Sequence, residues 1–142
     1  MTIRGQALMA GRAEAPALVL AEPLSFWGGI DVESGVVIDR SHPDLGTRIT
    51  GAVLVMPGGR GSSSSSSVLA ESLRLGTGPA AIVLAIPDPI LTVGAIVAWT
   101  LYGVSCPIVV CPIDDLVTGA TLAVESDASG TATVSMRRID LE

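Results

Sequence analysis

The chain has 142 residues, which is enough for one domain whose core needs no disulfide or metal ion to hold it together. Its formal net charge is -6, and all eight basic residues are scattered arginines. Phosphate recognition needs clustered cations, so this composition argues against a nucleic-acid-binding surface, and we expect a small molecule or another protein as the ligand.

The apolar residues are mostly aliphatic, because hydrophobic residues make up 49% of the chain and aromatic residues only 3%. The mean hydropathy of +0.60 is high for a small domain. A partner that covers part of the surface would account for this surplus, since monomers rarely leave large apolar patches in contact with water. A central sheet that is buried on both faces would account for it equally well.

The first third of the chain predicts short strands over residues 6–9 and 17–21, separated by a polar loop at residues 11–16. Residues 23–31 then combine two of the four large aromatic side chains with a glycine pair. This combination indicates either a shaped functional loop or a packing turn at the edge of the core.

A short strand is predicted over residues 36–40, and a turn-rich segment at 41–46 follows it. This segment holds the only histidine, His42, for which we weigh a direct chemical role against a role in shaping the loop. Residues 51–57 then predict a buried strand, because 52–56 are continuously apolar.

The most informative segment runs from Pro57 through Gly59, Arg60 and Gly61 to Ser62, and continues as serines to residue 67. It stands between a predicted strand and a predicted helix. Backbone N–H groups at a helix N-terminus attract anions, and an arginine beside them can pair with a carboxylate or phosphate in bidentate fashion. The segment therefore predicts an anion site.

A run of six serines is also typical of a flexible linker. Here it does not separate two domains, because strand-like sequence precedes it and a strand–helix–strand pattern follows it. We expect one of residues 64–67 to cap the helix through its side chain, and the helix to run to Leu75. The segment lacks the lysine of a nucleotide-binding P-loop and does not match the dinucleotide-binding glycine pattern.

The remaining pattern predicts a strand at residues 79–85, a helix at 90–102 and a strand at 107–111. Short links between these elements imply a parallel sheet with right-handed crossovers. Residues 121–125 and 131–136 flank a turn and predict an antiparallel hairpin. The whole chain, 1–142, is predicted to be a single α/β domain with a parallel centre and an antiparallel layer built from both chain ends.

Cys106 and Cys111 are predicted to be buried free thiols, because their spacing along an extended segment places them on opposite faces. Free thiols fit a reducing cytoplasm, as does a start at residues 1–10 without the apolar core of a signal peptide. The apolar run at 90–101 is too short to cross a bilayer, which takes roughly 20 residues.

Several segments together span nearly the whole domain and carry a family resemblance: Pro23–Asp31, Gly35, Asp39, His42–Pro43, Gly46, Leu54–Pro57, Gly59–Ser62, Glu71, Ile90 and Gly94–Ile96. They resemble the small subunit, or swivel domain, of aconitase X type hydro-lyases. The serine-rich stretch after Ser62 departs from the more varied sequence of archaeal relatives, so it leaves the helix cap undefined.

The resemblance implies a swivelling β/β/α domain that docks on a larger subunit and closes an active site with it. The larger subunit would hold an iron–sulfur cluster, and this chain would hold no metal. The resemblance assigns Ser62 as the proton acceptor, which removes a substrate C–H proton as hydroxide leaves toward the iron. From chemistry we add Arg60 as the stabilising cation, and we expect Gly59, Gly61 and Ser63 to contact the small hydroxy-acid substrate.

Members of this family dehydrate either cis-3-hydroxy-L-proline or mevalonate 5-phosphate. The lysine-free composition, rich in Ala, Gly and Arg, favours the first substrate, because thermophilic archaeal proteins are enriched in Lys and Glu. A non-catalytic anion-binding or regulatory module is the alternative. A phosphohistidine carrier at His42 is disfavoured, because no Thr- and Gly-rich sequence precedes that residue.

Overall fold

Seven strands close into a barrel in the order β1-β7-β6-β5-β2-β8-β9 in a computed structural model that describes residues 1–137. The elements in chain order are β1 (Thr2–Met9), β2 (Gly11–Val19), α1 (Phe26–Gly29), β3 (Ile30–Asp31), β4 (Val36–Val37), β5 (Val53–Met56), α2 (Ser65–Leu75), β6 (Ala81–Leu84), α3 (Pro89–Tyr102), β7 (Ile108–Val110), β8 (Thr121–Ser126) and β9 (Thr131–Arg137).

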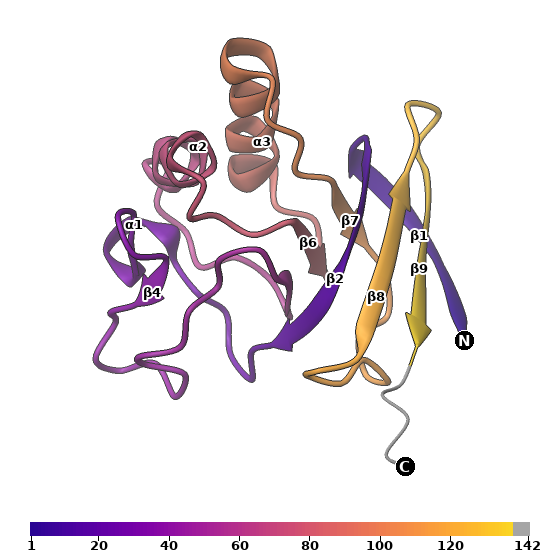
Figure 1. The fold of residues 1–142 in the computed structure, drawn as a ribbon, viewed down its shortest axis with the longest axis horizontal. Coiled ribbons are helices and arrows are strands. Elements are labelled where there is room, and N and C mark those ends of the chain that lie inside the picture. Colours follow the sequence, from indigo (N-terminus) through magenta and orange to yellow (C-terminus); the bar gives the residue numbers. More distant parts are fainter. Residues whose placement is uncertain (138–142) are drawn as a thin grey trace.

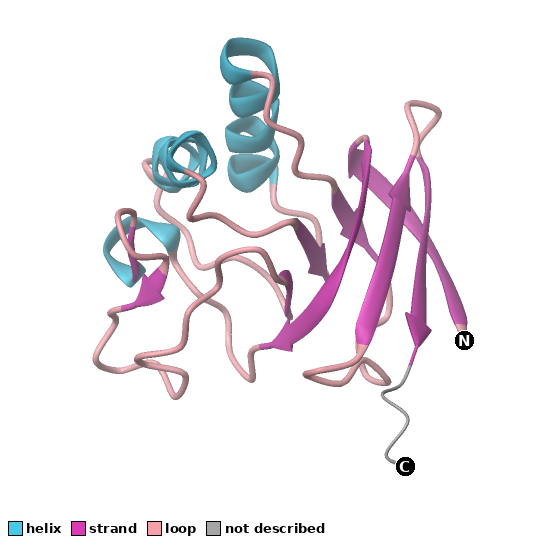
Figure 2. Ribbon diagram, viewed as in Figure 1, coloured by secondary structure: helices cyan, strands magenta, loops and turns pink. Residues whose placement is uncertain are grey.

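One half of the barrel is the predicted parallel sheet. Strands β5, β6 and β7 run parallel, and the end of β2 joins β5 in the same direction. Every residue of β5 and β6 is buried, which explains their unbroken apolar sequences. Helices α2 and α3 lie on the outer side of these strands (Figures 1 and 2). Both helices end at a left-handed glycine, Gly76 and Gly103, as the sequence predicts.

The other half is antiparallel and is built from both ends of the chain, as predicted. Strand β8 pairs with β9, β9 with β1, and β8 with β2. The polar loop predicted at residues 11–16 is wrong, because these residues pair with β8 as the first part of β2. Arg12 and Glu14 are exposed while Ala13 and Ala15 are half-buried, so the segment alternates as a strand does but lacks large apolar residues.

The two faces of the parallel strands belong to two separate cores. One core lies between these strands and the helices, and the other fills the interior of the barrel. Cys106 belongs to the first core and Cys111 to the second, which confirms that they are buried on opposite faces. Burial raises the pKa of the Cys106 thiol to about 12 and that of Cys111 to about 11.

A long excursion between β2 and β5 covers one side of the helical layer. It contains the single turn α1 and the two-residue strands β3 and β4, which pair with each other. The predicted strand at 36–40 is thus limited to Val36–Val37. The chain turns after it because the Asp39 carboxylate accepts hydrogen bonds from the N–H and hydroxyl groups of Ser41, at 3.0 and 2.7 Å.

Candidate functional site

The glycine-rich loop leaves the carboxyl end of β5 and leads into α2, and two neighbouring segments hold it in place. On one side, Gly59 forms a bridge to Leu24, whose carbonyl oxygen accepts the Arg60 N–H at 3.4 Å. On the other side, a Cβ atom at Gly59 would lie 1.8 Å from Oδ2 of Asp88. Gly59 is therefore required by the close approach of the α3 start, where Asp88 caps the helix by accepting from the N–H groups of residues 90 and 91.

Ser62 lies half-buried at the start of α2. Its Oγ accepts a hydrogen bond from the Ser64 N–H at 3.3 Å, and its carbonyl oxygen accepts the Ser65 N–H at 3.0 Å. A hydroxyl in this position receives a backbone donor at the positive end of a helix, and both effects stabilise negative charge on oxygen.

The prediction that a side chain among residues 64–67 caps α2 is wrong. Ser64 is the N-cap residue, but its hydroxyl makes no capping hydrogen bond. The hydroxyls of Ser66 and Ser67 donate instead to the carbonyl oxygens of Ser63 and Ser64, at 3.0 and 3.1 Å. Serines inside a first turn bond back to the preceding carbonyls in this way, so Ser64 occupies the N-cap position without a side-chain capping bond.

The backbone N–H groups of Gly61, Ser62 and Ser63 have no hydrogen-bond acceptor within residues 1–137. Gly61 and Ser63 are exposed, and open space surrounds the position of a Cβ at Gly61. Three successive donors near the beginning of a helix are the backbone groups that an anion site at this place would use.

Arg60 is exposed, and its guanidinium makes no hydrogen bond or ion pair in the described part of the chain. Its charge nevertheless acts on Asp39. Hydrogen bonds from the side chain and backbone of Ser41 are the main reason that the pKa of Asp39 lies below its usual value, and the charge of Arg60 adds to the effect. Arg60 and Asp39 thus share one side of the loop, and Arg60 does not contact Ser62.

The aromatic loop of residues 23–29 is fastened to the start of α2 by Ser65. The Ser65 hydroxyl is buried, accepts the Trp27 N–H at 3.1 Å and lies 3.5 Å from Oγ of Ser25. The Trp27 side chain itself is 57% exposed. Sequence reasoning missed both Ser65 and Asp88. Only Asp88 carries a local signal, an aspartate immediately before a proline at a helix start.

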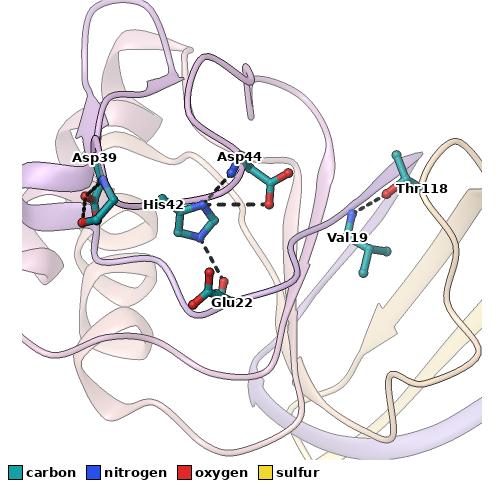
Figure 3. Close-up of polar contacts among 7 residues, drawn as sticks. Val19, Glu22, Asp39, His42, Asp44 and Thr118 are labelled. Atoms are coloured by element: carbon teal, nitrogen blue, oxygen red, sulfur yellow. Dashed lines mark hydrogen bonds and ion pairs between the residues drawn. The ribbon is translucent and has the colours of Figure 1, made fainter.

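His42 shapes the loop beside this site (Figure 3). The ring is buried, and its Nε2 lies 3.1 Å from the Glu22 carbonyl oxygen. Nδ1 lies 3.0 Å from the Asp44 N–H and must accept its hydrogen bond. This pattern requires a neutral ring with its proton on Nε2, which donates to Glu22. Both nitrogens are thereby committed to holding residues 22 and 42–44 together.

A metal site in this chain would need several ligating side chains close together. Within residues 1–137, no group of three or more His, Cys, Asp or Glu side chains lies close enough together to hold a metal ion. The two thiols lie in different cores and are protonated at neutral pH. These side chains therefore do not fit an iron–sulfur cluster, whose ligands are convergent thiolates. In the same part of the chain, no helix combines the length and apolar character of a membrane span.

A barrel with helices on one side, and a glycine–arginine–serine loop at the start of one of them, defines the chain as a β/β/α domain. The chain belongs to the aconitase X swivel domain family, whose family model matches residues 2–134. A crystal structure of aconitase X from Thermococcus kodakaraensis superposes with a TM-score of 0.86, covering 97% of this chain and 99% of that chain at 30% identity. The resemblance and the fold class predicted from the sequence are confirmed.

Two relatives differ in how much of their own length this chain covers. A cis-3-hydroxy-L-proline dehydratase from Pseudomonas aeruginosa is 52% identical over 101 residues, which cover 71% of this chain but only 17% of that protein. A phosphomevalonate dehydratase small subunit from Methanothermobacter thermautotrophicus is 40% identical over 116 residues, covering 82% of this chain and 84% of that subunit. The chain thus spans about a fifth of the length of the first kind of relative and most of the length of the second.

Proposed function

We propose that this chain is the small subunit of an aconitase X type hydro-lyase and that it supplies Ser62 as the proton acceptor. In the proposed reaction, Ser62 Oγ takes a proton from a substrate carbon while the neighbouring carbon–oxygen bond breaks. The elements of water leave, and a carbon–carbon double bond forms. The proposal draws on the dehydratase names of the two kinds of relatives and on the position of the Ser62 hydroxyl.

The observation that carries the proposal is the hydrogen bond from the Ser64 N–H to Ser62 Oγ, at the start of α2. A serine hydroxyl is too weak an acid to act as a base near neutral pH unless its alkoxide is stabilised. The Ser64 N–H and the helix start supply part of that stabilisation. We propose that the N–H groups of Gly61 and Ser63 and the Arg60 guanidinium, which have no hydrogen-bond partner within residues 1–137, bind the carboxylate of a hydroxy acid.

A second polypeptide has to complete this site. The loop lies on an open surface, and Arg60 and Ser63 are exposed, so water has free access to it. A hollow of about 300 Å³ lies elsewhere, on the antiparallel layer, and contains none of the predicted site residues. We propose that a large subunit excludes water by closing over the loop and that it also carries any iron–sulfur cluster, because the thiols of this chain cannot ligate one.

For the substrate we propose cis-3-hydroxy-L-proline, on the strength of the 52% identity to the Pseudomonas enzyme and the lysine-free composition. The alternative is mevalonate 5-phosphate, because the two-subunit relatives carry that name and match over more of their length. Turnover of both compounds by the reconstituted enzyme decides between them. A non-catalytic anion-binding role remains the alternative from a different class.

The test is Ser62→Ala in the complex with the cognate large subunit. We expect kcat to fall by about 10²- to 10⁴-fold, the usual loss when a proton acceptor is removed, while the complex still assembles. Ser67→Ala is the matched control, because this exposed hydroxyl bonds only to its own helix. Undiminished turnover in Ser62→Ala would contradict the catalytic role and favour the anion-binding alternative.

A further inference from the structure

The outer face of α3 is apolar, although the helix lies on the surface. Residues 89–113, which include all of α3, contain no charged side chain. The buried face of α3 is formed by Leu91, Gly94, Ala95 and Ala98. A surface helix ordinarily places polar residues opposite such a face. Helix α2 does so, with Glu71 and Arg74 paired on its exposed side.

Five large apolar residues are exposed on α3 and in the loop before it, and we call them together the α3 patch. Its members are 45–66% exposed: Ile86, Val93, Ile96, Trp99 and Leu101. Side chains of this size and exposure present on the order of 500 Å² of apolar surface, near the upper end for a monomeric protein. Figure 2 shows α3 at the outer edge of the molecule, with its neighbouring helix α2 on one side only.

The α3 patch is continuous with the candidate site. Ile86 lies against the glycine-rich loop, because a Cβ atom at Gly58 would be 2.8 Å from the Ile86 Cγ1. Asp88, two residues further on, contacts the position of Gly59 in the same way. A partner that covers the glycine-rich loop would therefore also contact Ile86, and α3 continues from there.

We infer that the α3 patch is the docking surface for the large subunit, an inference that rests on the proposed function. Area favours this occupant over a second copy of the chain. A partner in a standard interface contributes about 800 Å², and a symmetric pair of α3 patches would bury only about 1,000 Å² in total, at the lower limit for a specific interface. A large subunit that covers the patch together with the adjoining loop would bury more area than the patch alone.

The experiment measures the affinity of the chain for the separately purified cognate large subunit by titration calorimetry. In Val93→Lys an ammonium would be buried without a partner, so we expect the Kd to rise at least about 100-fold. Val117→Lys is the control, because Val117 is equally exposed, at 52% against 50%, but belongs to the loop between β7 and β8. Its Kd should stay within about threefold of the wild-type value. Circular dichroism and thermal melting confirm that both variants fold.

The result separates this inference from the proposed function. If Val93→Lys binds as tightly as the wild type while Ser62→Ala abolishes turnover, the docking surface is wrong and the catalytic role stands. If Val93→Lys weakens binding while Ser62→Ala retains turnover, the docking surface is right and the catalytic role fails. A wild-type dimer in sedimentation that Val93→Lys converts to a monomer, with unchanged affinity for the large subunit, would assign the patch to self-association and overturn the inference.

Discussion

The variant Ser65→Ala tests whether the aromatic loop is held to the start of α2 by one buried hydroxyl. Ser65→Ala removes the acceptor that the Trp27 N–H uses at 3.1 Å. Leaving a buried donor unsatisfied costs about 1–3 kcal/mol. Trp27 is partly open to water, and alanine is the better helix former by a few tenths of a kcal/mol, so we expect a net loss near the lower limit, about 1 kcal/mol.

Two measurements check this value. Urea unfolding should show a lower midpoint with an unchanged slope. Amide hydrogen exchange by NMR should show about fivefold less protection at the Trp27 N–H, the factor that corresponds to about 1 kcal/mol. Ser67→Ala serves as the control, because its hydroxyl is exposed and bonds within the helix. If Trp27 exchanges equally slowly in wild type and Ser65→Ala, the hydroxyl does not fasten the loop and the reasoning is refuted.

Two further predictions concern the packing of the loop and of the thiols. Gly59→Ala should displace the loop and reduce both stability and turnover, because the added Cβ would clash with Asp88. Gly61→Ala is the control, because open space surrounds the added Cβ and thermal stability should stay nearly unchanged. Equal melting temperatures of the two variants would contradict the contact between Gly59 and Asp88. Cys106 and Cys111 should resist thiol reagents at pH 7 in the folded chain and react once it is unfolded, and fast labelling of the native chain would show that they are accessible. Because burial raises both thiol pKa values, their contribution to stability should be complete below about pH 9 and be lost between about pH 9 and 12, as pH-dependent urea midpoints would show.

The parallel half of the fold could be predicted from the sequence because its signals are local. Strands β5 and β6 are continuous apolar runs, and helix α3 ends at a glycine. The first part of β2 could not be predicted, because alternating alanines and charged residues give a weak strand pattern. Its conformation is determined by pairing with β8, which lies more than 100 residues further along the chain.

The candidate site, like the fold, could be predicted only where its signals are local. The loop around Arg60 and Ser62 could be located from its own residues, because glycines before a helix start are a local signal. The attachments of the loop are long-range: the bond between Trp27 and Ser65 joins residues 38 apart in sequence. The serine run concealed which residue occupies the N-cap position, because six identical residues offer no pattern to distinguish them. The chemistry assigned to Ser62 comes from the family resemblance, since the loop alone indicates only an anion.

A glycine allows the two helices beside the site, α2 and α3, to approach each other closely. A Cβ atom at Gly94 of α3 would lie 2.6 Å from the carbonyl oxygen of Ser66, in the first turn of α2. The absence of a side chain at this position allows the backbone of α2 to touch α3 four residues after Ser62. The helix that presents the α3 patch therefore also supports the start of α2. A partner bound to the patch would therefore contact the helix that packs against the start of α2, close to the Ser62 hydroxyl.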